Sequence, residues 1–202
     1  MTANQAINRI RYKLDQLDTS NTSYADTEII KEVNAARREM SRILPKRLFP
    51  NLLTTADINI ESGKGVLPSN YLEVYPSGYT LIDSVQATMI DPVLLPNLTR
   101  NLNTAPGTEN KYYFIQAGQF YAFPVTSESS TFNYYAYPAD LSESGGTSDV
   151  TDLPEDINDI AVELAFAALM STERGNAALA ASVQNDAYAK IKTIIATNQP
   201  GA

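Results

Sequence analysis

The 202-residue chain contains no cysteine, no histidine and no tryptophan. Without cysteine it has no disulfide, thiol nucleophile, zinc knuckle or iron–sulfur site, and without histidine it has no imidazole for a catalytic triad or a metal site. Carboxylate pairs, lysine Schiff bases and carboxylate-held Mg²⁺ or Ca²⁺ remain as enzymatic options. Because none of these has a recognisable signature here, the sequence predicts a protein that is not an enzyme and needs no cofactor or metal.

Long apolar runs are also missing. The best candidate, residues 160–170, is interrupted by Glu163 and is shorter than the roughly 18 apolar residues of a membrane span. Residues 1–14 alternate polar and apolar side chains and lack the apolar core of a signal peptide. We therefore expect a protein that is kept in a cytosol-like compartment and does not enter a membrane.

The net charge of −8 is unevenly distributed. Residues 1–50 hold nine basic and six acidic side chains, whereas residues 51–202 hold six basic and seventeen acidic ones. An acidic body does not bind phosphate backbones by counterion release, which disfavours storage or sequence-specific reading of nucleic acid. It does not exclude contact with DNA that slides past without sticking, and solubility alone is also a sufficient reason for the charge.

Apolar side chains at three- and four-residue spacing predict a pair of helices at each end of the chain. The first helix covers residues 2–17, and the second follows a capping box of Ser23 and Asp26 and stops at Pro45. Its apolar stripe consists of Ile30, Val33, Ala36, Met40, Ile43 and Leu44. A short connection favours antiparallel packing of the two helices.

The third predicted helix begins at Pro154 and is apolar nearly all round over residues 160–170, so it must be packed on at least two sides. Asp149, Asp152, Glu155 and Asp156 crowd its start, where acidic groups complement the helix dipole. A metal site is the alternative for this cluster, but the spacing of a calcium-binding loop is missing. A fourth helix carries Val183, Ala187, Ile191, Ile194 and Ile195.

The middle of the chain is predicted to be β-rich. Residues 57–61 and Val66-Leu67-Pro68 flank a turn at residues 62–65 and form a hairpin, and residues 79–87 form a further extended stretch. Residues 91–107 contain three prolines and predict a long irregular loop. Four leucines are expected to anchor this loop on an apolar surface: Leu94, Leu95, Leu98 and Leu102.

Aromatic side chains concentrate in residues 112–137, which hold six of the twelve tyrosines and four of the six phenylalanines. A hairpin turning at Ala117-Gly118 places Tyr112 opposite Phe123 and Phe114 opposite Tyr121 on one face. The other face pairs Tyr113 with Ala122 and Ile115 with Phe120. A second aromatic strand follows at residues 131–137. Because both faces are apolar, the second face must be covered by the chain's own helices or by another chain.

These patterns predict an α+β fold in which an N-terminal and a C-terminal helix pair pack together around an inserted antiparallel β-rich segment. The expected division is residues 1–50 with 150–202 for the helical domain, and residues 51–149 for the β-rich insertion.

Several short motifs occur in this order: Tyr24-Ala25-Asp26, Val66-Leu67-Pro68, Tyr112-Tyr113-Phe114-Ile115-Gln116-Ala117-Gly118-Gln119 followed by Pro124, Asn133-Tyr134-Tyr135-Ala136-Tyr137-Pro138, and Leu153-Pro154-Glu155. Together they resemble the head-to-tail adaptor (connector) proteins of tailed bacteriophages. The resemblance covers most of the chain and is weakest across residues 86–110.

This resemblance implies a virion protein of the neck, assembled in the bacterial cytoplasm. It implies a ring, commonly dodecameric, that sits beneath the portal protein, extends the DNA channel and offers a platform to tail or nozzle proteins. The helices would build the ring wall, and the segment after Ile194 would reach towards the portal. The residues expected at interfaces with other chains are Tyr112, Phe114, Tyr121, Tyr135, Tyr137, Phe166, Leu169, Ile194 and Ile195.

Two other functions remain open from the residues alone. The aromatic segment is compatible with a sugar- or protein-binding module, which for a sugar requires several coplanar exposed rings. The chain is also compatible with another assembly component of a phage tail or neck.

Overall fold

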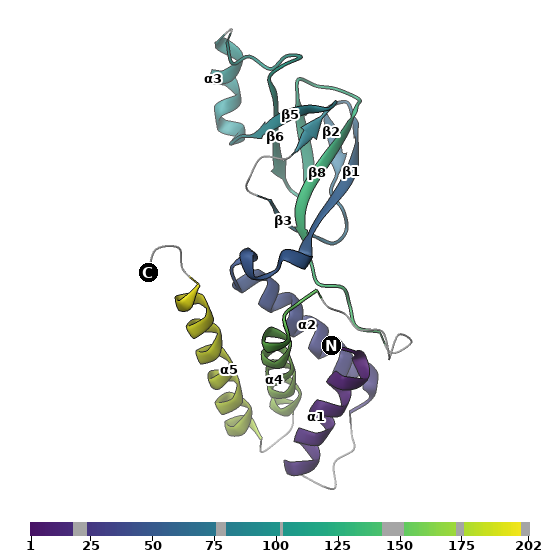
Figure 1. Cartoon of the computed structure of the whole chain (residues 1–202), viewed down its shortest axis with the longest axis vertical. Coiled ribbons are helices and arrows are strands. Elements are labelled where there is room, and N and C mark those ends of the chain that lie inside the picture. Colours follow the sequence, from purple (N-terminus) through teal and green to yellow (C-terminus); the bar gives the residue numbers. More distant parts are fainter. Residues whose placement is uncertain (18–23, 76–79, 102, 143–151, 173–175, 199–202) are drawn as a thin grey trace. The chain divides into compact units, whose positions relative to one another are not determined.

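The computed structural model describes residues 1–17, 24–75, 80–101, 103–142, 152–172 and 176–198. The chain divides into two compact units, and Figure 1 shows their elements. The helical unit consists of Met1–Leu52 and Tyr137–Ala202, and the β unit of Leu53–Ala136. The predicted α+β class, with a β-rich segment between N- and C-terminal helices, is therefore confirmed. The segment from Tyr137 onward groups with the helices, whereas the sequence analysis assigned residues 137–149 to the β-rich part.

Four long helices form the helical unit: α1 (Ala3–Leu17), α2 (Asp26–Ile43), α4 (Glu155–Ser171) and α5 (Ala177–Thr197). Two 3-10 turns follow α2, at Lys46–Leu48 and Pro50–Leu52. Helix α4 contacts α1, α2 and α5, and its buried side chains include Ile157, Val162, Leu164 and Phe166. The predicted packing of this helix on at least two sides is confirmed.

Helix α2 begins and ends slightly differently from the prediction. The residue before its first turn is Ala25, whose backbone N–H donates to the Glu28 carboxylate at 3.0 Å. Glu28 thus has the role predicted for Asp26, and the expected partner Ser23 lies outside the described residues. At the other end Ile43 is exposed because the helix stops there, and Leu44 packs inside instead.

The described residues of the β unit form eight strands: β1 (Leu53–Glu61), β2 (Lys64–Val66), β3 (Tyr71–Val74), β4 (Leu81–Ile82), β5 (Val85–Met89), β6 (Lys111–Gln116), β7 (Gln119–Phe123) and β8 (Ser129–Ala136). Their order is β1-β2-β7-β6-β5-β4-β8-β3, and β1 also pairs with β8, so the sheet closes on itself and β3 lies beside β8 outside the closed ring. Among the described strands, β5 and β6 form the one parallel pair, which departs from the predicted antiparallel arrangement.

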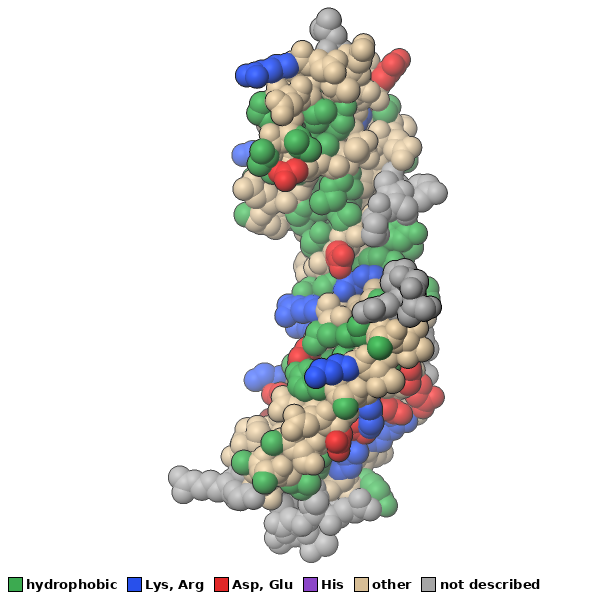
Figure 2. All heavy atoms as spheres, turned by 90° about the vertical axis from the view of Figure 1, so that its left-hand side faces the viewer, with side chains coloured by type: hydrophobic (Ala, Val, Ile, Leu, Met, Phe, Trp, Pro, Cys, Tyr) green, Lys and Arg blue, Asp and Glu red, His purple; other side chains and the backbone are tan. Residues whose placement is uncertain are grey.

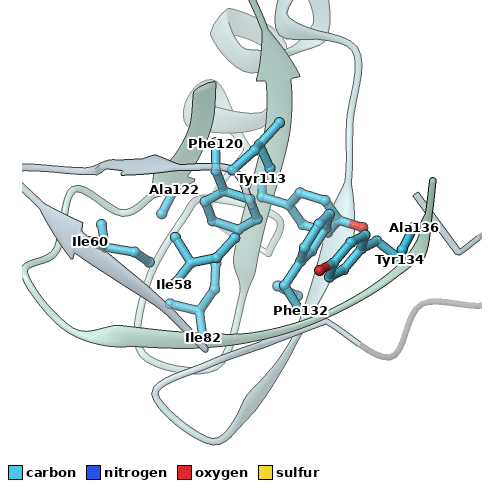
Figure 3. Close-up of a cluster of buried hydrophobic side chains, with 11 residues drawn as sticks. Ile58, Ile60, Ile82, Tyr113, Phe120, Ala122, Phe132, Tyr134 and Ala136 are labelled. Atoms are coloured by element: carbon cyan, nitrogen blue, oxygen red, sulfur yellow. The ribbon is translucent and has the colours of Figure 1, made fainter. Parts of the chain in front are cut away.

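The register predicted for the aromatic hairpin is confirmed at all four pairs, including Tyr112 opposite Phe123 and Phe114 opposite Tyr121. The inner face of the closed sheet holds the β-unit core (Figure 3), where Phe120 stacks on Tyr113 and both meet the edge or face of Phe132. Closure of the sheet was not predicted, and the expectation that helices or another chain cover a second face now concerns the outer face alone. Sheet closure covers one apolar face with the strands themselves.

Two further expectations for the β-rich segment are corrected. The stretch predicted at residues 79–87 is two strands, β4 and β5, because Asp83 and Ser84 adopt positive φ angles of 50° and 60° and turn the chain. The predicted irregular loop contains a 3-10 turn (Pro92–Leu94) and a short helix, α3 (Leu95–Arg100). Of its leucines, Leu94 is exposed and Leu95 and Leu98 are half-buried. Leu102 lies outside the described residues, as does Tyr79.

Gly65 in β2 is a position where the fold tolerates no side chain. A Cβ atom at this site would overlap the Ile58 Cγ2 atom on β1 and lie 3.2 Å from the Asn59 carbonyl oxygen. We expect Gly65→Ala to lower the free energy of unfolding by about 1–3 kcal/mol, because a packed strand pair must separate to admit the methyl group. Urea unfolding of the two proteins measures the difference.

Gly107 provides the matched control for this substitution. A Cβ atom there has no neighbour closer than 3.8 Å, the Ala105 carbonyl oxygen, so we expect Gly107→Ala to be nearly neutral. Equal stabilities of the two alanine variants would contradict the close approach of β2 to β1.

Candidate interaction surfaces

A buried arginine, Arg37, forms hydrogen bonds between separate segments of the helical unit. Arg37 on α2 is 1% exposed, and its Nη2 atom forms an ion pair with Asp152. Its Nη1 atom donates to the Ala139 carbonyl oxygen at 2.6 Å, and its Nε atom donates to the Asn158 side-chain oxygen at 3.2 Å. The Arg37 network, defined as these four residues, therefore joins α2 to the segment that follows β8 and to the first turn of α4.

Charge and burial act on Arg37 in opposite directions. Desolvation lowers the pKa of the guanidinium from its ordinary value, and the Asp152 carboxylate opposes this by raising it. The other Asp152 oxygen accepts the Ala139 backbone N–H at 2.7 Å. All three parts of the guanidinium thus have acceptors, as a buried cation requires.

The role of Asp152 differs from both interpretations offered by the sequence. It precedes α4, which begins at Glu155, and it faces Arg37 rather than the helix dipole. The described residues contain no group of three or more acidic side chains arranged to hold a metal ion. Glu155 and Asp156 lie in the first turn of α4, as predicted, and Asp149 lies outside the described residues.

A groove of about 260 Å³ runs between α2 and α5 over α4. We call it the alanine groove, because Ala35, Ala36, Ala165, Ala167 and Ala168 contribute to its lining. Glu32 and Glu39 lie on its α2 side, and none of the described residues that line it is basic. The Tyr188 hydroxyl of α5 donates to Glu39 at 2.8 Å, and this hydrogen bond is the main cause that raises the pKa of Tyr188. The groove is therefore apolar at its floor and acidic at one rim.

The outer face of the β unit carries a stack of aromatic rings. Phe114 lies between Tyr121, at a centroid distance of 4.7 Å, and Phe123, at 5.6 Å, and the three planes are nearly parallel. The Lys64 ammonium lies 5.7 Å from the Tyr121 ring centroid. The faces of these rings stack on one another, so the rings do not form the coplanar exposed platform that a sugar site needs.

The residues predicted at interfaces fall into two groups. Phe114, Tyr135, Phe166 and Leu169 are buried within the single chain, so little of their surface is left for a partner. Tyr112, Tyr121, Tyr137, Ile194 and Ile195 are half-buried and keep accessible surface. Within the helical unit, the Tyr137 ring lies under the Arg42 guanidinium, at 5.2 Å from ring centroid to Cζ. Tyr112 and Tyr121 belong to the β unit, and Tyr137, Ile194 and Ile195 belong to the helical unit.

One exposed aromatic residue was not predicted. Tyr12 on α1 is 66% exposed, and its hydroxyl has no hydrogen bond among the described residues. The sequence already indicates that Tyr12 is exposed, because it falls between Ile10 and Leu14 and outside the apolar stripe of α1. An aromatic side chain on the polar face of a helix is typical of an interface.

A comparison with models of protein families gives one match, described as SU10 adaptor protein, over residues 1–201. The chain belongs to this family. No curated protein matches the chain. The resemblance carried by the short motifs is thereby confirmed, and it places the chain among bacteriophage adaptor proteins, which are structural proteins of the virion. In the part of the chain that the structure describes, no helix has the length and apolar character to cross a bilayer.

Proposed function

We propose that this protein is a head-to-tail adaptor that forms a ring beneath the portal of a tailed bacteriophage. The ring extends the DNA channel and gives tail or nozzle proteins a surface on which to dock. The observation that carries this proposal is the family match, which extends over residues 1–201 and therefore includes both units. By resemblance the ring is dodecameric, and it acts by position and shape without turnover.

Helix α5 supports the ring. It has 21 residues, and only Ala180, Ala187 and Ile191 are buried, although the helix carries few charges. Its main neighbour is α4, and Leu179, Ile194 and Ile195 keep exposed surface. Figure 2 looks at the side of the helical unit on which α5 lies and shows uncharged atoms over much of it. Because only one side of this weakly polar helix is packed, we assign its other side to a contact with a neighbouring chain.

The accessible residues of the predicted interface follow from this arrangement. We assign contacts with other chains to Tyr112, Tyr121, Tyr137, Ile194 and Ile195, which keep accessible surface. The segment after Ile194 is assigned to the portal, as the resemblance implies. The net charge of −8 suits a lumen through which DNA passes without binding.

Mixing the purified protein with the portal protein of the same phage and imaging the product tests the proposal. We expect portal particles to carry an added ring of this protein on their tail-facing side, and the symmetry of that ring gives the copy number. Portal particles that stay bare at saturating protein concentration would overturn the proposal. Binding of the protein to glycans, with no binding to portals, would support the alternative of a sugar-binding module.

A further inference from the structure

The alanine groove has the properties of a receptor surface for a helix. Its floor is made of small side chains, so a larger side chain of a partner can approach the helix backbones closely. Its rim carries Glu39, which is held by Tyr188, and Glu32, which has no ion-pair partner among the described residues. Because no basic residue among those described lines the groove, Glu32 and Glu39 have no opposite charge within its described lining.

Helix α1 presents a complementary surface on the other side of the same unit. Figure 1 shows α1 and α5 on opposite sides of α4. Residues 1–14 contain Arg9, Arg11 and Lys13 and no acidic residue. Asn8, Arg11 and Tyr12 are exposed and lie at positions i, i+3 and i+4, so they share one face. This face combines the exposed Tyr12 ring with the Arg11 guanidinium, whereas Arg9 on the same helix is paired with Glu155 and Asp159.

Two complementary surfaces on opposite sides of one subunit are what a head-to-tail ring requires. In such a ring each copy uses one surface to bind the next copy and the other surface to receive the previous one. A twofold dimer instead needs a patch that complements itself, and neither surface does so, since one is acidic and the other basic. Opposite charges across an interface also fix the orientation of the partners.

We propose that the alanine groove of each copy receives α1 of the next copy, with the Tyr12 ring over the alanine floor and Arg11 beside Glu32. This inference rests on the proposed ring and names the surfaces that build it. Arg11 already pairs with Asp26 through its Nη2 atom at 2.6 Å, and its remaining N–H groups are available for a second carboxylate.

The absence of cysteine from the chain makes a direct test available. A double variant, Tyr12→Cys with Glu32→Cys, is assembled on portal particles and oxidised. We expect a ladder of covalent multimers on a denaturing gel that ends at the copy number of the ring. A mixture of the two single variants is expected to stop at dimers, because each chain then carries one thiol.

The control places the second cysteine at Arg47, in the 3-10 turn after α2, which is exposed and does not line the groove. Tyr12→Cys with Arg47→Cys is expected to give no ladder. If rings form on portals and the Tyr12 and Glu32 pair gives no ladder, the assignment of the groove is wrong and the proposed function stands. If no rings form with the unmodified protein, the proposed function itself is wrong.

A second measurement does not depend on cross-linking. We expect Tyr12→Ala to raise the protein concentration needed to fill half of the portal particles by about tenfold or more, as for a central interface residue. Arg47→Ala, at an exposed position outside both surfaces, is expected to leave this concentration unchanged. Equal concentrations for the two variants would contradict the role of Tyr12.

Discussion

Replacing Arg37 by alanine is expected to lower the free energy of unfolding of the helical unit by about 3–5 kcal/mol. The substitution leaves the carboxylate of Asp152, which is 13% exposed, without its cation. It also removes the donors to the Ala139 carbonyl oxygen and to Asn158. Urea unfolding followed by the far-ultraviolet circular dichroism of the helices measures the loss, since this signal reports on the helical unit.

The neighbouring residue supplies a matched control. Arg38 forms an ion pair with Asp140 at 2.6 Å, but the two side chains are 50% and 51% exposed. An exposed ion pair of this kind contributes at most about 1 kcal/mol, so Arg38→Ala is expected to have a small effect. Similar losses for the two variants would show that the stability attributed to the Arg37 network does not depend on burial.

The Arg37 network illustrates what the sequence does not disclose. The spacing of Val33, Arg37, Met40 and Leu44 places Arg37 on the buried stripe of α2, so its position was predictable. The partner of Arg37 was not predictable, because Asp152 is 115 residues away in the sequence. The acidic residues around Asp152 fit an ordinary helix start equally well. Periodicity shows which face of a helix is buried, but it does not show which distant residue meets that face.

The same limit applies to the β unit. The hairpin at Ala117-Gly118 was predicted with its register, because a tight turn fixes which residues face each other. Closure of the sheet was not predicted, since it depends on the pairings of β1 with β8 and of β5 with β6, which join segments separated along the chain. Closure buries the face that carries Tyr113 and Phe120, whereas the face that carries Phe114 and Tyr121 stays on the outside of the sheet.

The predicted interface shows how apolar residues in a core resemble those at an interface. Phe166 and Leu169 were assigned to other chains because α4 is apolar on every side, yet α1, α2 and α5 bury it within one chain. Composition cannot separate these cases, because both require an apolar side chain at helical spacing. The exposed fraction of each side chain in the structure distinguishes core residues from interface residues. It indicates Tyr12 and α5 as candidates for the interface.

Introducing a lysine at Phe166 is expected to prevent stable folding of the helical unit. Phe166 is 3% exposed, and the Lys13 ammonium lies 5.8 Å from its ring centroid, so a lysine there would be buried beside a charge of the same sign. Loss of the ring alone costs about 3–5 kcal/mol, and the buried unpaired charge adds to it. The sum is comparable with the total stability of about 5–15 kcal/mol of a typical domain. We expect insoluble protein or protein without a cooperative helical transition.

Two variants make this result interpretable. Ala168→Lys introduces the same residue two positions further along α4, where the side chain is exposed, and is expected to be nearly neutral because lysine is a good helix former. Phe166→Ala is expected to remain soluble and to lose about 3–5 kcal/mol, which urea unfolding measures. Because α4 is the helix that contacts the other three, a soluble Phe166→Lys protein that unfolds at the same urea concentration as Ala168→Lys would contradict the packing of the whole helical unit.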